Sequence, residues 1–273
     1  MKTKNSMLAA AAALIAAATL GACSQSKPDA DDTTMAFSTL SGHATYRLDN
    51  TAKIYNTDHD IAYFDSASVV MPTVIYNHDI TALQDSIISA AFDTVTTNHT
   101  DAMTSFFRKV ADESGFTAVE TDTARRSDVD GLSIVQGDIF NMSGDVLTYR
   151  VASYQYSPGA AHGMTITKYI TYLIQEGKLV TLDDLFSPEG LSQLPGLIRA
   201  RAEELAPSLG QTDITSLPSM GNFYISLDES IVFVYQPYEV ASYAQGAIAV
   251  PFYPYQLSDQ MTAEGLRIFG LGE

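Results

Sequence analysis

Residues 131–156 read GLSIVQGDIFNMSGDVLTYRVASYQY, two strand-like runs separated by a turn. Leucine, isoleucine, valine and tyrosine recur along both runs, and Gly137 interrupts the first. This short apolar period, bounded by glycine and serine, is typical of β-strands, and Asn141–Asp145 suits a hairpin turn. Because the same period extends from residue 116 to residue 173, the sequence predicts an antiparallel meander in the middle of the chain.

The flanking segments change to a helical period. Apolar side chains fall on one helical face at 80–91, at 103–110 and, beyond Ser187-Pro188, at 191–205. Further strands are expected at 68–76, 223–227, 231–235 and 247–252, with Pro72 confining the first to an edge or a bulge. We therefore predict an α+β fold made of two small mixed domains, with antiparallel sheets and helices packed on one face.

The composition limits the class of protein. The chain has 273 residues, 46% of them hydrophobic, so it can bury a sizeable core and the bulk of it is not disordered. Its formal net charge of −17 argues against nucleic acid as a partner, because phosphate contacts need clustered Lys and Arg. A single cysteine excludes a disulfide framework and a cysteine-rich zinc site.

The first 23 residues are typical of a bacterial lipoprotein signal. Lys2 and Lys4 precede the uncharged run Met7–Leu20, which is too short to span a bilayer, and the run ends in Leu20-Gly21-Ala22-Cys23. We expect residues 1–22 to be removed and Cys23 to carry the lipid that anchors the protein in the cell envelope, on the periplasmic or surface face of an outer membrane. The alternative is an ordinary secretory cleavage site with an incidental cysteine.

These features divide the chain into segments. Residues 23–41 are predicted to be the lipidated cysteine and a flexible tether, because they are mostly small and polar. Residues 42–150 are predicted to form an N-terminal α+β domain, 151–260 a C-terminal α+β domain, and 261–273 a tail.

The sequence holds no familiar catalytic motif. There is no G-x-S-x-G elbow and no H-E-x-x-H, and Asp128–Gly131 lacks the acids that a calcium loop needs at its first and last ligand positions. We expect no catalytic residue, no metal and no cofactor.

One histidine stands in an unusual context. His162 ends the small-residue loop Ser157–His162 between two strands. Three roles are open for it: holding the loop through hydrogen bonds, contacting a ligand, or, less in keeping with the absence of partner residues, catalysis or metal binding.

Two stretches carry a resemblance to a known family. Residues 154–186 contain Gly159-Ala160-Ala161-His162 and then LVTLDDLF, and residues 233–246 read FVYQPYEVASYAQG. Together they resemble the envelope domain of unknown function in the lysozyme-sensing anti-sigma-V factor of bacilli. Residues 44–149 resemble the small domain that precedes it there, and that also occurs beside an envelope polysaccharide deacetylase domain.

The resemblance implies an envelope binding module for a protein or glycan ligand, with a basic protein such as lysozyme as one partner that the acidic charge would favour. Rigid aromatic side chains would supply the contacts. The candidate ligand-binding residues are Tyr154, Tyr156, His162, Tyr238, Glu239 and Tyr243. The alternatives are a cell-wall carbohydrate-active enzyme and an envelope assembly or scaffold protein.

The lipid anchor is directly testable. Replacing Cys23 with serine removes the thiol that accepts the lipid, so Cys23→Ser should leave the precursor unprocessed or release the protein from the membrane fraction. Cell fractionation with mass measurement of the processed chain checks this. A cleaved Cys23→Ser protein that stays in the membrane fraction would contradict the anchor.

Overall fold

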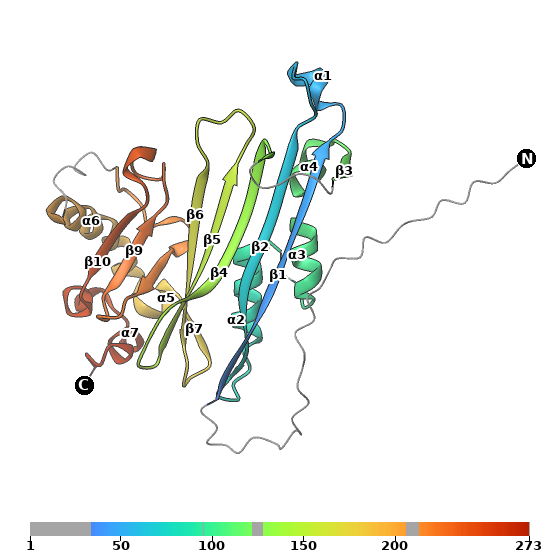
Figure 1. Cartoon of the computed structure of the whole chain (residues 1–273). Helices are drawn as coiled ribbons and strands as arrows, with labels where there is room; N and C mark the ends of the chain where they lie inside the picture. The colour runs from blue at the N-terminus through green and yellow to red at the C-terminus, as the bar shows by residue number, and fades with distance from the viewer. Residues whose placement is uncertain (1–33, 95, 122–127, 206–212, 273) are drawn as a thin grey trace, which may run out of the picture.

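The computed structural model describes residues 34–94, 96–121, 128–205 and 213–272 as a mixed α+β protein, which confirms the predicted class (Figure 1). The strands are β1 Met35–Leu48, β2 Ala62–Ile75, β3 Ala118–Glu120, β4 Gly131–Ser143, β5 Val146–Tyr156, β6 Met164–Leu173, β7 Lys178–Val180, β8 Phe223–Ile225, β9 Ile231–Tyr235 and β10 Ile248–Phe252. The α-helices are α1 Thr51–Tyr55, α2 Thr81–Phe92, α3 His99–Phe106, α4 Lys109–Ser114, α5 Leu182–Leu185, α6 Pro188–Leu205 and α7 Ala263–Ile268. Short 3-10 helices lie at η3 Ser219–Gly221, η4 Tyr243–Gln245 and η5 Pro254–Gln260.

A seven-stranded sheet runs through the molecule in the order β3-β1-β2-β4-β5-β6-β7. Its neighbouring strands are antiparallel except for β2 and β4, which are parallel. A parallel pair needs a long crossover. The chain from α2 to β3 provides it, and this crossover carries the three helices that cover the sheet (Figure 1).

The predicted meander is present as β4, β5 and β6, with its hairpin turn at Gly144 in the left-handed conformation that glycine tolerates. Pro72 lies in β2 opposite a bulge at Ala36/Phe37 of β1, beyond the last residue of β2 that pairs with β4. Proline is tolerated at such a bulge, because the ladder of backbone hydrogen bonds is interrupted there.

One face of the sheet packs on α2 and α3. The stripe that the sequence predicts for α2 is buried, with Leu83, Ile87 and Ile88 fully enclosed. These side chains meet apolar residues that point the same way from β2, β4, β5 and β6, and together they form the N-terminal core. The helical pattern at 103–110 is split into α3 and α4, because Arg108 adopts a left-handed conformation between them.

The opposite face of β5–β7 packs on the C-terminal elements. There β10, β9 and β8 form a three-stranded antiparallel sheet. Its fully buried Phe233 and Tyr235 pack with Leu185, Leu194 and Ile198 of the helices α5 and α6 in a second large core.

The domain boundary predicted at 150/151 is wrong, because it falls inside β5, which pairs with β4 and β6 along its whole length. Consecutive residues of this strand serve different cores. Leu147 and Tyr149 face α2 in the first core, whereas Val146 packs against the second and the Thr148 hydroxyl donates to the Ile225 carbonyl oxygen at 3.0 Å. The two halves thus share strands of one sheet.

The predicted tether and tail are also too long. Residues 35–41 pair with β2 as the first half of β1, so the part of the proposed tether from Met35 on is folded. The segment from Met261 on includes α7, which packs against α5, and the Thr262 hydroxyl donates to the Asp184 carbonyl oxygen at 2.6 Å. The local composition of the two segments does not predict their contacts with β2 and α5, because these partners are distant in sequence.

The predicted signal peptide, Cys23 and residues 24–33 of the tether lie outside the described residues. Among the helices of the described ranges, none combines the length and the apolar character needed to cross a membrane.

Candidate functional site

The loop between β5 and β6 meets the loop after β9, and aromatic side chains gather where they meet. The His162 ring stacks on Tyr243, with ring centroids 3.6 Å apart and planes inclined by 14°. Tyr238 flanks both, with its centroid 6.4 Å from that of His162 and 5.5 Å from that of Tyr243. We call these three residues, with Tyr154 and Gly163, the His162 surface.

Hydrogen bonds fix the orientation of the imidazole. Nδ1 of His162 lies 3.1 Å from the Gly163 carbonyl oxygen, which also accepts from the Tyr243 hydroxyl at 2.7 Å. Because a carbonyl only accepts, Nδ1 carries the proton in this arrangement and Nε2 accepts from the Tyr238 hydroxyl at 3.4 Å. These contacts are the kind expected for the first of the three roles predicted for His162, that of holding the loop through hydrogen bonds.

Gly163 brings Tyr154 into the group. A Cβ atom at Gly163 would lie 2.2 to 2.5 Å from atoms of the Tyr154 ring, so the ring packs directly on this glycine. Only glycine permits so close an approach. Tyr156 is half-buried near the end of β5, and within the described residues it makes no ring contact with the His162 surface.

Side-chain amides position the loop that carries Tyr238. Gln236 bonds β6 like a neighbouring strand: its Oε1 accepts from the Thr167 N–H at 2.9 Å and its Nε2 donates to the Thr167 carbonyl oxygen at 2.7 Å. The buried Asn222 does the same at the next site along the edge, where its Oδ1 accepts from the Tyr169 N–H at 2.9 Å. The edge of β6 is thereby closed beyond the end of β7.

Glu239 braces this loop from within. Its carboxylate accepts from the Gln236 N–H at 2.7 Å and from the N–H and hydroxyl of Ser219 at 2.6 and 2.8 Å. Of the six predicted ligand-binding residues, the structure thus brings together Tyr154, His162, Tyr238 and Tyr243, and gives Glu239 a supporting position.

The rings of the His162 surface differ in exposure. Tyr238 is 59% exposed and His162 is also exposed, whereas Tyr154 and Tyr243 are half-buried beneath them. The arrangement offers a stacked aromatic face with hydroxyl groups at its edge. Such a face is suited to contact with a partner, since aromatic rings supply large contact area at small loss of side-chain entropy.

Comparisons with known proteins agree with this fold. Residues 183–253 match the model of a family described as "Protein of unknown function (DUF3298)". That segment contains Tyr238, Glu239 and Tyr243, whereas Tyr154, Tyr156 and His162 precede it. No curated protein sequence matches the chain significantly.

Two solved structures share the architecture. A DUF3298 family member from Bacteroides fragilis superposes with a TM-score of 0.63 at 16% identity, covering 87% of this chain and 97% of that one. A DUF3298 family protein from Pseudomonas aeruginosa gives a TM-score of 0.57 at 13% identity, covering 86% of this chain and 98% of that one. At these identities the likeness is one of fold.

A second site lies on the other face of the sheet, between the strands and helices α2–α4. It is a cavity of about 380 Å³, within the range of small-molecule pockets. We call it the Phe106 cleft. The side chains that give it its chemical character are Asp65, Phe106, Lys109, Ser133, Gln155 and Lys168.

Asp65 is the most unusual of these residues. It is 1% exposed, and its Oδ2 accepts from the Arg108 N–H at 2.9 Å, while Oδ1 has no hydrogen-bond partner. Burial raises the pKa of this carboxyl, and the Arg108 N–H and the nearby Tyr46 and Ser133 hydroxyls oppose the rise. The bond to Arg108 also holds the left-handed turn between α3 and α4.

Sequence reasoning missed Asp65, although a signal was present. In β2 the buried positions alternate, and Asp65 is in phase with Tyr63, Ala67 and Val69. An acid on the inward face of a strand is costly to bury without a partner, so such a residue points to a special site. The cleft itself depends on the parallel pairing of β2 with β4, for which the sequence has no local signal.

The Asp65 carboxyl should make stability depend on pH. Its pKa is higher in the folded chain than in the unfolded chain, so between the two values the folded state binds more protons and stability falls as the pH rises. Asp65→Asn keeps an oxygen acceptor for Arg108 and removes the titration. The unfolding free energy of the variant relative to the native chain should therefore increase as the pH rises above the ordinary aspartate pKa of about 4.

Urea unfolding at several pH values measures this difference. Asp58→Asn is the matched control, because its hydrogen bond to His59 lowers the pKa of the exposed Asp58 and any change should have the opposite sign and be small. A difference between Asp65→Asn and the native chain that is constant with pH would contradict this assignment.

Proposed function

We propose that this protein is a non-catalytic binding module of the bacterial cell envelope, held there by a lipid on Cys23. The basic start, short apolar run and Leu20-Gly21-Ala22-Cys23 support the anchor. The resemblance of residues 154–186 and 233–246 to the envelope domain of the anti-sigma-V factor supports the location. Removal of residues 1–22 deletes two lysines and no acids, so the mature protein would be more acidic still.

The His162 surface is our candidate for ligand contact. The observation that carries this proposal is the exposed Tyr238 ring beside the stacked His162 and Tyr243 rings, on loops that Gln236 and Glu239 hold in place. A preorganised aromatic face loses little entropy on binding, which is how tyrosine-rich contact surfaces gain affinity.

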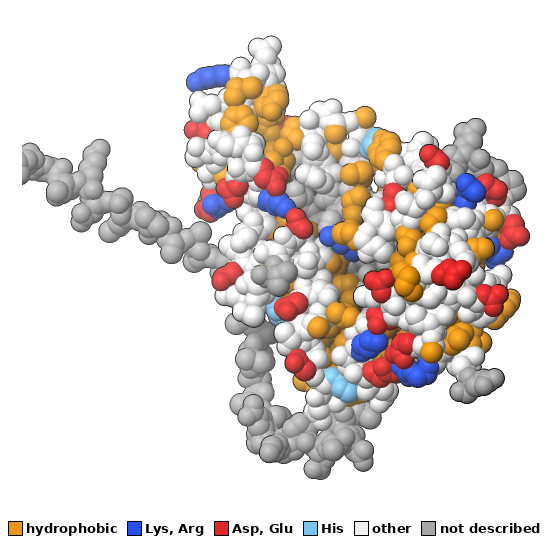
Figure 2. Space-filling view, turned by 180° about the vertical axis from the view of Figure 1, so that it is seen from behind, with side chains coloured by type: hydrophobic (Ala, Val, Ile, Leu, Met, Phe, Trp, Pro, Cys, Tyr) orange, Lys and Arg blue, Asp and Glu red, His pale blue; other side chains and the backbone are white. Residues whose placement is uncertain are grey.

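A basic protein is the ligand we favour, with lysozyme as the example implied by the resemblance. The net charge of −17 attracts such a partner over a distance and accelerates its association. Acidic side chains are spread over both halves of the face in Figure 2, so the attraction would come from the whole molecule. The aromatic surface would then fix the position of the bound partner.

An enzyme acting on cell-wall carbohydrate is the runner-up. It would need convergent titratable groups beside His162, whereas the two imidazole nitrogens face a backbone carbonyl and a tyrosine hydroxyl. Within the described residues, no three His, Cys, Asp or Glu side chains are grouped to hold a metal ion. These contacts favour the binding module over the enzyme.

Hen egg-white lysozyme is a suitable basic probe for calorimetric titration. Tyr238→Ala removes an exposed ring of the His162 surface, so affinity should fall at least about tenfold, as for other aromatic residues central to an interface. Tyr255→Ala is the matched control, since Tyr255 is 65% exposed and, among the residues that the structure describes, its ring stacks only on Tyr253.

Binding should also weaken as salt is raised, since the long-range attraction is electrostatic. Absence of lysozyme binding at low salt would contradict the proposed ligand. Equal affinity of the native, Tyr238→Ala and Tyr255→Ala proteins would contradict the proposed surface. Binding of a chitooligosaccharide that only Tyr238→Ala abolishes would show that a glycan is the ligand instead.

A further inference from the structure

The floor of the Phe106 cleft is a row of polar side chains on adjacent strands. Asp65 of β2 pairs with Ser133 of β4, and Ser133 pairs with Gln155 of β5. Adjacent strands lie about 4.8 Å apart, so the three groups span roughly 10 Å in a line. A carboxyl, a hydroxyl and an amide therefore present both hydrogen-bond acceptors and donors along one edge of the cavity.

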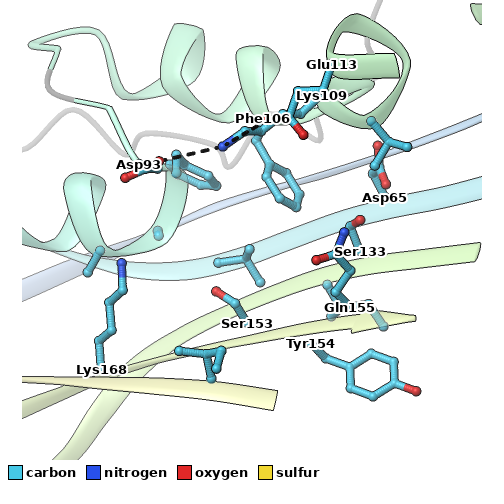
Figure 3. Close-up of a pocket in the computed structure, with 17 residues that line it drawn as sticks. Asp65, Asp93, Phe106, Lys109, Glu113, Ser133, Ser153, Tyr154, Gln155 and Lys168 are labelled. Atoms are coloured by element: carbon cyan, nitrogen blue, oxygen red, sulfur yellow. Dashed lines mark ion pairs between the residues drawn. The ribbon is translucent and has the colours of Figure 1, made fainter. Parts of the chain in front are cut away.

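The roof supplies an aromatic ring. Figure 3 shows the Phe106 ring pointing from α3 into the cleft, above the sheet residues that form the floor. Phe92 and Phe107 pack on this ring at centroid distances of 5.8 Å, so neighbouring aromatic side chains hold it in position. The ring is half-buried and leaves a face toward the cavity.

Two lysines line the same cavity with different pairing. The Lys109 ammonium lies 3.7 Å from Asp93 and 3.8 Å from Glu113, and both acids belong to the cleft lining. Lys168 rises from β6 toward the end of α2 in Figure 3, and its ammonium has no ion pair or hydrogen bond among the described residues. The Gln155 amide likewise has no hydrogen-bond partner among the residues that the structure describes.

These groups together match the needs of a sugar ring. A pyranose presents several hydroxyls that each donate and accept, and an apolar face of C–H groups that packs on an aromatic ring. Unpartnered donors at Lys168 and Gln155, a carboxyl and a serine on the floor, and Phe106 above them answer both features. We propose that the Phe106 cleft is a binding site for a saccharide unit.

The free oxygen of Asp65 fits the same ligand. Oδ1 lacks a donor in the structure, and a buried acceptor without one is costly. Ser133 pairs with Asp65 on the next strand, so a sugar hydroxyl that donates to Oδ1 would lie beside the Ser133 hydroxyl as well. A fatty acid or another largely apolar ligand would leave this polar row unpaired, and we expect such ligands to bind more weakly.

The site is separate from the His162 surface. Tyr154 of the His162 surface also borders the cleft, but in Figure 3 its ring points away from the cavity, whereas the next residue of β5, Gln155, lies in it. The two surfaces therefore lie on opposite faces of one sheet. Tyr238 does not line the cleft and Gln155 is not part of the His162 surface, so variants of these two residues distinguish failure of the saccharide site from failure of the proposed function.

Ligand-observed NMR and calorimetric titration test the proposal with the mature chain. The probes are glucose, galactose, mannose and N-acetylglucosamine, each up to millimolar concentration, with hexanoate as the apolar acid. At least one sugar should bind, and Gln155→Ala and Lys168→Ala should each weaken it about tenfold, because each removes a hydrogen bond to the ligand. Both side chains are outside the cores, so these variants should fold, which circular dichroism checks.

Two controls separate the cleft from other surfaces. Lys53→Ala removes an exposed lysine at the α1 tip, and Tyr255→Ala removes an exposed ring that stacks on Tyr253, so neither should change the sugar affinity. The proposal is overturned if none of the four sugars binds, if hexanoate binds more tightly than all of them, or if the two cleft variants bind the sugar as well as the native chain does.

Discussion

The alternation of side chains along β5 and β6 is the constraint on which the rest of the structure depends. Most sheets of this size bury one face, but here both faces of the same strands carry a large core. Tyr172 points toward the helix-covered core and Leu173 toward the C-terminal one. Any shift of register by one residue would exchange the two sets and disrupt both cores at once.

This arrangement also explains where the two candidate sites lie. Beyond the ends of the cores, the same alternation directs Tyr154 to one face and Gln155 to the other. On the first face, loops held by side-chain amides present exposed rings, which is the geometry of a surface for a large partner. On the second, helices leave a cavity over the sheet, which is the geometry of a site for a small ligand. One strand, β5, therefore contributes a residue to each of the two candidate sites.

Much of the local structure could be predicted from the sequence. The stripe of α2, the meander and the hairpin turn at Asn141–Asp145 follow from patterns over a few residues, and the structure confirms them. The contact of His162 with Tyr243 could be expected only through the resemblance that selected both. His162 and Tyr243 are far apart in sequence, and the periodicity of a single element does not predict which loops will come into contact.

The errors share one physical cause. The tether, the tail and the domain boundary were judged from local composition, whereas residues 35–41, α7 and β5 are held by partners far away in the chain. Asp65 was missed for a related reason. Its carboxyl becomes buried only when β1, β2 and β4 assemble, and its hydrogen bond comes from the turn at Arg108. A short stretch of sequence does not show which distant residues will bury a side chain, so it does not predict the free energy of that burial.

The central claim is that the shared strands make the two halves one cooperative unit. Differential scanning calorimetry of the chain from Thr34 onward tests it most directly. Because both cores need β5 and β6, we predict a single transition whose van't Hoff enthalpy equals the calorimetric enthalpy. Two separated transitions, or a van't Hoff enthalpy near half of the calorimetric value, would show that the halves unfold independently and would contradict the account.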